Sequence, residues 1–155
     1  MIKRLFLQIA TSFSVEVTAE SDVADREDAL RLATAVLMID VARADHVFDE
    51  SEFERVLQLI ESHFGLTPEQ SAELVNAAGS KAEEMVSLYD FTQLLHKHLD
   101  DTDKAHIISL LWQVAYADGQ LDKYEDSLVL KISDLLYVSR GRVMRLKHDA
   151  QQKFG

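Results

Sequence analysis

Six carboxylates recur in this sequence as two sets with the same spacing. Each set reads Asp, three residues, Asp, two residues, Glu, and adding 73 to the numbers of the first set gives the second. Carboxylate oxygens are hard ligands that suit Ca²⁺, Mg²⁺ or Mn²⁺. The pattern therefore predicts a divalent-cation site at each set. The sets are Asp45, Asp49 and Glu52, and Asp118, Asp122 and Glu125.

The same acids also have a structural interpretation that needs no metal. An Asp that opens a helix, followed three residues later by Glu, is an acidic capping box worth about 1 kcal/mol. The second and third acids of each set fit this pattern. The first acids, Asp45 and Asp118, instead follow the end of a helix, where the macrodipole disfavours negative charge by roughly 0.3–1 kcal/mol. Spacing alone leaves both interpretations open.

The two loops differ at the residue after the first Asp. Gly119 can adopt the left-handed conformation that ends a helix, whereas His46 adopts it less readily. We therefore favour the second loop as the cation site and interpret His46 as a surface residue at a helix end. The segment ADGQLDKYE is not an EF-hand, because no oxygen ligands alternate ahead of its glycine.

Helical periodicity surrounds both sets of acids. The segments ALRLATAVLMIDVARA and AHIISLLWQVAYA are apolar almost all round, so they predict two central helices that end at the acidic loops. Thr67, Pro68 and Gln70 predict a capped helix start. A break is expected near Gly79 and Ser80, with the third and fourth helices either separate or bent into one. The expected helices cover about 29–44, 53–64, 68–78, 88–99, 105–117, 128–136 and 140–154.

The order of core helix, acidic loop, amphipathic helix and capped helix occurs twice. The spacing between the copies is 73 through the acidic loops and later becomes 72, where Leu74 aligns with Leu146. Such a repeat predicts an internal duplication with halves at about 28–80 and 101–154. The expected fold is all-α, a compact bundle of about seven helices built from two related halves.

Residues 1–25 are expected to form an amphipathic helix and an acidic linker ahead of the main domain at 26–155. A secretory signal is one interpretation of this start, although polar residues interrupt its apolar stretch. Packing on the main domain is the second, and docking to a membrane surface or partner is the third. The apolar positions at helical spacing are Ile2, Leu5, Phe6, Ile9 and Phe13.

Composition limits the function classes further. The chain of 155 residues has 47% hydrophobic content, enough for the core of one domain, and no Cys, so disulfides, thiolate metal sites and Cys nucleophiles are excluded. The formal net charge of -11 repels phosphate backbones and favours cations or basic partner surfaces. The sequence has no Ser-His-Asp series, no phosphate-cradling Gly loop and no Glu-x-x-His pair, so we predict neither an enzyme nor a nucleic-acid-binding protein.

Four segments resemble the TerB-like family known from tellurite-resistance operons: VARADHVFDESE, LYDFTQLL, VAYADGQLDKYE and ISDLLYVSRGRV. The resemblance covers roughly residues 26–153, and its most specific part is the repeated element with the two sets of acids. His46 departs from the glycine usual in that element. The resemblance implies a compact helical domain of two related halves, with the same six carboxylates as a metal-binding or acidic surface.

The resemblance also implies a role in stress response at the inner face of the membrane. We therefore expect a cytoplasmic, non-enzymatic, cation-responsive adaptor with Ca²⁺, Mg²⁺ or Mn²⁺ and no organic cofactor. The expected partner is a protein with a basic surface, and residues 2–13 are the candidate for peripheral membrane contact. The alternative is an interaction domain that docks a basic partner without metal. Without Cys, thiol-based reduction of tellurium oxyanions is excluded.

Overall fold

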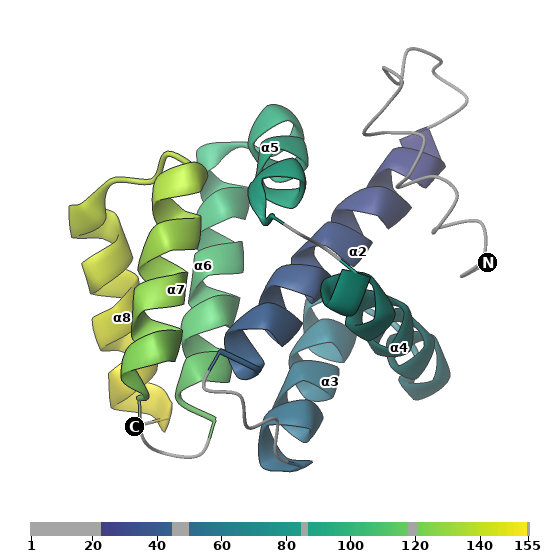
Figure 1. Cartoon of the computed structure of the whole chain (residues 1–155), viewed down its shortest axis with the longest axis horizontal. Coiled ribbons are helices and arrows are strands. Elements are labelled where there is room, and N and C mark those ends of the chain that lie inside the picture. The colour runs from purple at the N-terminus through teal and green to yellow at the C-terminus, as the bar shows by residue number, and fades with distance from the viewer. Residues whose placement is uncertain (1–22, 45–49, 85–86, 118–120, 155) are drawn as a thin grey trace.

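Helices make up almost all of the described chain. The computed structural model describes residues 23–44, 50–84, 87–117 and 121–154. These residues contain seven α-helices and no strand, which confirms the predicted all-α fold. The helices are α2 (Val23–Ala42), α3 (Glu50–Phe64), α4 (Pro68–Glu84), α5 (Tyr89–His98), α6 (Asp101–Ala115), α7 (Lys123–Leu135) and α8 (Arg140–Phe154) (Figure 1).

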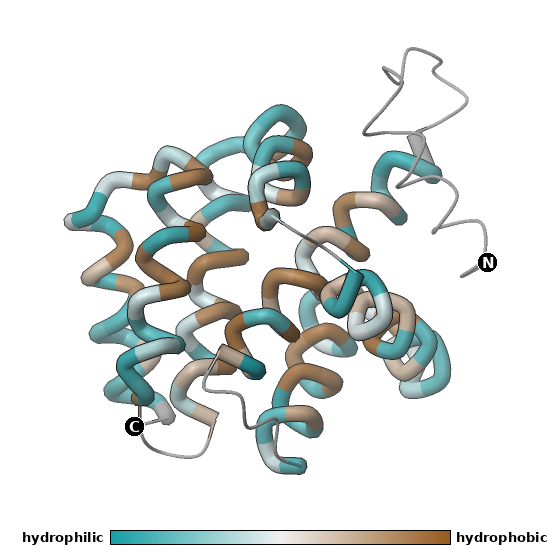
Figure 2. Tube along the Cα trace, in the orientation of Figure 1, coloured by the Kyte–Doolittle hydropathy of each residue, from teal (hydrophilic) through white to brown (hydrophobic). Residues whose placement is uncertain are grey.

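The two helices that are apolar all round lie at the centre of the bundle. In α2, Leu32, Val36 and Leu37 are fully buried although they point in different directions around the helix. This is possible because α2 contacts α3, α4, α5, α6 and α7. In α6, Trp112 and Leu111 are likewise fully buried. Figure 2 shows hydrophobic segments gathered along both helices.

Two groups of three helices have the same internal packing. Helix α2 packs on α3 and most extensively on α4, while α6 packs on α7 and most extensively on α8. Figure 1 shows α6, α7 and α8 side by side, with α2, α3 and α4 forming the other part of the bundle. Helix α5 lies between the groups and contacts α2 and α7. The duplication that would explain this correspondence remains a prediction from the sequence.

The third helix of each group starts with a hydroxyl cap. The Thr67 hydroxyl accepts a hydrogen bond from the Gln70 amide at 3.1 Å, and the Gln70 side chain accepts one from the Thr67 amide at 3.0 Å. This is the predicted capping box of α4. At α8 the Ser139 hydroxyl accepts from the Arg142 amide at 3.3 Å.

The second helix of each group ends in the left-handed conformation. Gly65 after α3 has φ of 63°, and Tyr137 after α7 has φ of 61°. The amide of the next residue then bonds to the carbonyl five residues back, at 3.2 Å for Leu66 and 3.1 Å for Val138. These bonds satisfy helix-terminal carbonyls in the manner of a Schellman motif.

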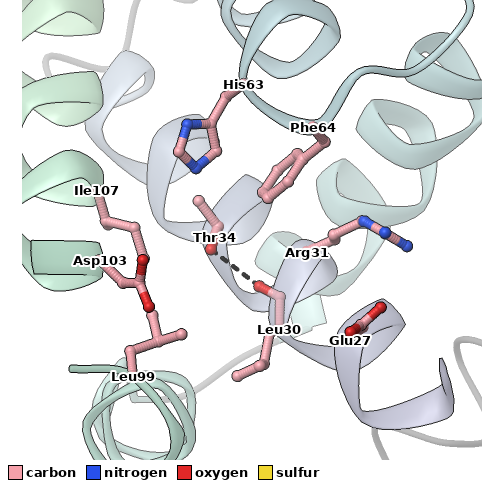
Figure 3. A pocket seen from close by; sticks show the side chains of 9 residues that line it. All are labelled: Glu27, Leu30, Arg31, Thr34, His63, Phe64, Leu99, Asp103 and Ile107. Atoms are coloured by element: carbon pink, nitrogen blue, oxygen red, sulfur yellow. Dashed lines mark hydrogen bonds between the residues drawn. The ribbon is translucent and has the colours of Figure 1, made fainter. Parts of the chain in front are cut away.

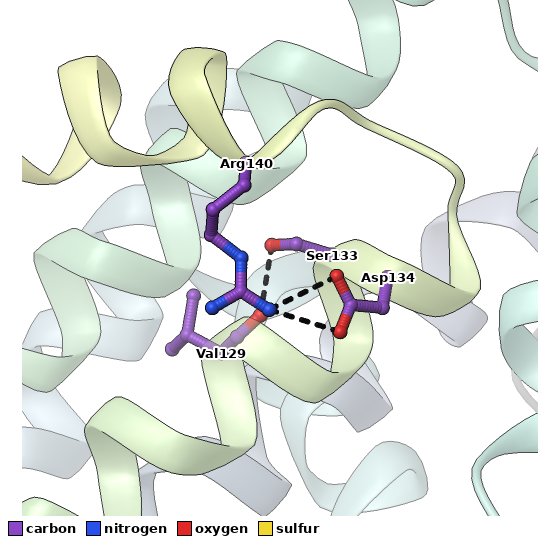
Figure 4. A network of polar contacts seen from close by, with 4 residues as sticks. All are labelled: Val129, Ser133, Asp134 and Arg140. Atoms are coloured by element: carbon purple, nitrogen blue, oxygen red, sulfur yellow. Dashed lines mark hydrogen bonds and ion pairs between the residues drawn. The ribbon is translucent and has the colours of Figure 1, made fainter.

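A polar contact joins α7 to the start of α8 (Figure 4). One guanidinium nitrogen of Arg140 donates to both carboxylate oxygens of Asp134, at 3.0 and 3.2 Å. Inside the same turn the Ser133 hydroxyl donates to the Val129 carbonyl at 2.8 Å. Because both charged side chains are more than half exposed, we expect the ion pair to contribute less than about 1 kcal/mol.

Two details of the predicted helices were wrong. Helix α4 continues through Gly79 and Ser80 to Glu84, so the expected break is absent, and α4 and α5 are separate helices. A glycine costs a helix only about 1 kcal/mol, and the buried residues Leu74 and Ala78 hold α4 against the core. Helices α2, α6 and α7 also begin earlier than the predicted ranges, at residues 23, 101 and 123.

The predicted N-terminal amphipathic helix lies outside the described residues. Among the helices of the described chain, none has both the length and the apolar composition needed to cross a membrane.

Candidate functional site

The described residues include three of the six carboxylates predicted from the sequence. Glu52 lies in the first turn of α3, and Asp122 and Glu125 open α7. The other three acids, Asp45, Asp49 and Asp118, lie outside the described residues, together with His46 and Gly119.

The two central helices end in the same way where the acidic loops begin. After α2, the Ala44 amide bonds to the Val41 carbonyl at 3.1 Å. After α6, the Ala117 amide bonds to the Val114 carbonyl at the same distance. The first acid of each set directly follows this turn in the sequence. Each loop therefore leaves its central helix from an equivalent backbone position.

Asp122 is the N-cap of α7. Its Oδ2 atom accepts hydrogen bonds from the backbone amides of Tyr124 at 2.8 Å and Glu125 at 3.3 Å. The capping interpretation of the second acid is therefore correct for this loop. Both capping bonds use one oxygen, and a carboxylate has acceptor capacity on its second oxygen as well. The cap and a cation ligand are compatible roles for this side chain.

Glu52 and Glu125 are buried, with exposed fractions of 3% and 2%. The Oε2 atom of each has essentially no exposed surface. Each glutamate lies four residues before a fully buried valine, Val56 in α3 and Val129 in α7, and so shares the inward face of its helix. Both glutamates make interactions within the protein. Ionised carboxylates that are buried need a partner or a metal to offset their desolvation.

The sequence predicted these glutamates to be cation ligands or capping residues, and their burial was missed. The signal was present in the helical spacing, since position i−4 from a buried residue lies on the same face. A charged residue type at that position argued against burial, because Glu is almost never buried without a partner.

No organised metal cluster is found among the residues that the structure describes. Within 23–44, 50–84, 87–117 and 121–154, no three His, Asp or Glu side chains are grouped as a ligand set. Three of the six predicted ligands lie outside these ranges, so the predicted sets are incomplete there. The donor chemistry of the described acids fits a hard cation, since all three offer carboxylate oxygens.

Comparison with known proteins places this arrangement in a family. The family model described as tellurite resistance protein TerB matches residues 31–148. The chain belongs to the TerB family. The TerB match includes both sets of acids and most of the described helices, which confirms the resemblance noted in the sequence. No curated protein and no solved structure shows significant similarity to the chain.

Among the described carboxylates outside the acidic loops of this TerB domain, Asp40 has a shifted pKa. Burial raises the pKa of Asp40, while the positive charges of Arg43 and Lys131 act in the opposite direction. Within the described residues Asp40 has no ion pair closer than 4 Å, and the two positive charges that act on it belong to Arg43, just after α2, and to Lys131 in α7. It is a half-buried carboxyl in a surface groove that Lys131 and Tyr89 also line.

A further polar group was missed in the sequence. Lys104 in α6 is 5% exposed, and its ammonium lies 2.6 Å from Nδ1 of His96 in α5. The exposed ring of Tyr137 lies against His96, with ring centroids 4.5 Å apart. His96 thus joins α5 to α6 and to the end of α7. A clue was available for Tyr137, which stands 72 positions after Gly65 at the corresponding helix end.

Proposed function

We propose that this TerB-family protein is a non-enzymatic module that binds a divalent cation at its acidic loops and uses the bound state to control docking of a partner. The observation that supports this most directly is the burial of Glu52 and Glu125. Both acids stand at the same place after a loop that carries two further acids, and both are at most 3% exposed. Burial of surface-type carboxylates at two corresponding places is costly unless the carboxylates serve as ligands or partners.

The chemistry of the acids selects the class of cation. Carboxylate oxygens suit Ca²⁺, Mg²⁺ or Mn²⁺, and Cys is absent from the chain. A bound cation would supply positive charge to the acids of its loop. Asp122 and Glu125 are the ligands proposed from α7 and Glu52 from α3, with Asp45, Asp49 and Asp118 proposed from the loops.

The proposed partner is a protein with a basic surface, since the net charge of the chain is -11. Membership of the TerB family supports a stress-response context. We propose a cytoplasmic location at the inner membrane face, with residues 2–13 in peripheral membrane contact. The basic residues Lys3 and Arg4 suit an anionic membrane surface.

A second candidate function is an interaction domain in which the acids bind no metal. The hydrogen bonds of Asp122 to two backbone amides favour it, because they give this acid a structural role without a cation. In that case the acidic loops would contact basic side chains of the partner directly.

The deciding experiment is a calorimetric titration of the chelator-treated full chain with Ca²⁺, Mg²⁺, Mn²⁺ and Zn²⁺. We expect saturable binding of a hard cation with Kd of about 100 μM or tighter. At a hundredfold excess over Kd, such binding stabilises the fold by about 2.7 kcal/mol, which raises Tm by roughly 5–10 °C.

The variants Asp118→Asn, Asp45→Asn and Asp122→Asn each remove one proposed ligand charge. Asparagine caps helices about as well as aspartate, so Asp122→Asn keeps the α7 cap while weakening cation binding. Asp90→Asn, at an exposed position in the first turn of α5, removes the same charge elsewhere and serves as the control. If no ion produces heat of binding, and no ion shifts Tm by more than the added ionic strength alone does, the proposed cation binding is wrong. The metal-free interaction domain is then favoured.

A further inference from the structure

A second site of different chemistry lies at the opposite end of α2 from the acidic loops. A cavity of about 230 Å³ opens there between α2, the end of α3 and the first turns of α6 (Figure 3). Its apolar wall is made by Leu30, Phe64, Leu99 and Ile107. Glu27 on its rim and Ala44 before the first acidic loop are separated by about 25 Å of helix. The cavity is therefore independent of the proposed cation site.

Two side chains that line this cavity donate hydrogen bonds within the protein. The Arg31 guanidinium donates to Asp28 at 2.7 Å and lies 6.0 Å from the centre of the Phe64 ring. Figure 3 shows this guanidinium turned away from Asp103. The Thr34 hydroxyl donates to the Leu30 carbonyl at 2.9 Å. The Thr34 hydroxyl proton is thus used within α2, while Arg31 uses one of its five N–H groups on Asp28 and lies on the side of the lining away from Asp103.

The remaining polar groups of the lining are two carboxylates, which only accept hydrogen bonds, and one imidazole. The Glu27 and Asp103 carboxylates form no ion pair within the part of the chain that the structure describes. Burial lowers the pKa of His63, and neighbouring His106 lowers it further, while Asp103 acts in the opposite direction. The imidazole is therefore mainly neutral at pH 7 and offers one acceptor nitrogen and one N–H group. In Figure 3, His63 and Asp103 face the same space from α3 and α6.

We propose that this cavity binds a small organic cation, a primary alkylammonium whose head lies at the Asp103 carboxylate beside His63 and whose aliphatic body lies against Leu30, Leu99 and Ile107. The exposed Asp103 carboxylate holds the ammonium at the solvent boundary, which avoids full desolvation of the charge. The Phe64 ring adds an aromatic surface that attracts cations. The volume is below the roughly 300–1,000 Å³ typical of drug-sized ligands, so the ligand is smaller.

The test is an NMR titration of the ¹⁵N-labelled full chain with hexylammonium, hexan-1-ol and hexanoate. The three probes share one tail and differ in the charge of the head. We expect hexylammonium to cause saturable shifts at amides around Glu27–Arg31, His63 and Asp103. The alcohol should bind at least about tenfold more weakly, and the carboxylate more weakly still.

The variant Asp103→Asn should weaken hexylammonium binding at least about tenfold. Asp101→Asn is its matched control, since it removes the same charge from the same turn of α6 at an exposed position that does not line the cavity. The control should bind within about twofold of the unmodified chain. A general effect of charge at the α6 N-terminus would lower both affinities equally and would overturn the proposal.

Three other results would also overturn the proposal. The first is equal affinity for hexylammonium and hexan-1-ol, which would make the cavity merely apolar. The second is a set of shifts confined to the acidic loops. The third is binding that occurs only after Lys3→Ala and Arg4→Ala, which would identify the basic N-terminal segment of the chain itself as the occupant.

Discussion

Two different residues take the same left-handed conformation at the ends of α3 and α7. Gly65 does so freely, while Tyr137 is a residue for which this conformation costs roughly 1–2 kcal/mol. The contact between the Tyr137 and His96 rings offsets part of that cost, since such ring pairs contribute about 0.5–1.5 kcal/mol. The strained residue at the end of α7 therefore contacts His96 of α5, the side chain that also reaches Lys104 in α6.

We predict opposite effects for alanine at two glycines. Gly65→Ala should lower the free energy of unfolding by roughly 1 kcal/mol, because φ of 63° is unfavourable for alanine. No atom lies within 4 Å of the added Cβ, so the cost is purely conformational. Gly79→Ala, inside α4 with equally open space, should raise it by about 0.5–1 kcal/mol.

Urea unfolding of the two variants measures both free energies. Each variant adds the same methyl group. If both variants changed the free energy of unfolding in the same direction, the conformational explanation would be contradicted and the methyl group itself would be the cause.

For single residues, the sequence predicted those whose role is local and missed those whose role depends on packing. The Thr67 cap and the Asp122 cap follow from residue type and spacing. The burial of Glu125 depends on the packing between helices, and the contact of Lys104 with His96 depends on how the consecutive helices α5 and α6 fold against each other. Composition and hydropathy give no sign that a charged side chain is buried, and the helical spacing that placed Glu125 on the inward face was outweighed by its residue type.

The elements themselves were largely predictable because the apolar spacing of each helix is strong. Two central helices could be identified from their all-round apolar character, which only a helix enclosed by others can satisfy. The wrong break at Gly79 arose because a glycine in a helix is a weak signal that packing overrides. The acidic loops were assigned from spacing, and the structure describes only their edges, at Glu52 and at Leu121 and Asp122.

Corresponding helices in the two groups differ at one buried position. Ser71 in α4 and Val143 in α8, 72 positions apart, are both fully buried. Within the described residues the Ser71 hydroxyl has no hydrogen-bond partner. A buried hydroxyl without a partner costs about 1–3 kcal/mol, so this site is less favourable in α4 than in α8.

Ser71→Ala should therefore raise the free energy of unfolding by about 1 kcal/mol. The converse change, Val143→Ser, should lower it by about 2 kcal/mol or more, because it removes buried methyl groups and buries a hydroxyl. Chemical denaturation of both variants provides the measurement. Destabilisation by Ser71→Ala would mean that the hydroxyl has a partner, such as a buried water.

The charge of the whole molecule is uneven. Helix α8 is rich in basic residues, whereas the chain as a whole has a formal charge of -11. Within the described chain, the Lys147 ammonium of α8 lies 2.7 Å from the Asp126 carboxylate. This ion pair joins the basic helix α8 to α7. The basic residues of α8 are Arg140, Arg142, Arg145, Lys147 and Lys153.

We predict that monovalent salt stabilises the fold. Raising NaCl from about 10 to 200 mM should raise Tm by a few degrees, because screening weakens the repulsion among excess carboxylates. KCl should act equally, which separates screening from specific ion binding. A fall in Tm would show that attractive pairs such as Lys147–Asp126 outweigh the repulsion. Thermal melts followed by circular dichroism are sufficient.

The position of α2 at the centre has a consequence for synthesis of the chain. Helix α2 is made first among the described helices, and its partners α3 and α4 follow directly, so one side of it can be covered early. Its contacts with α6 and α7 need residues made much later. Until those helices emerge, a nascent chain displays an uncovered apolar face, the kind of surface that chaperones bind and that promotes aggregation. The central helix that organises the finished bundle is thus also its most vulnerable part during translation.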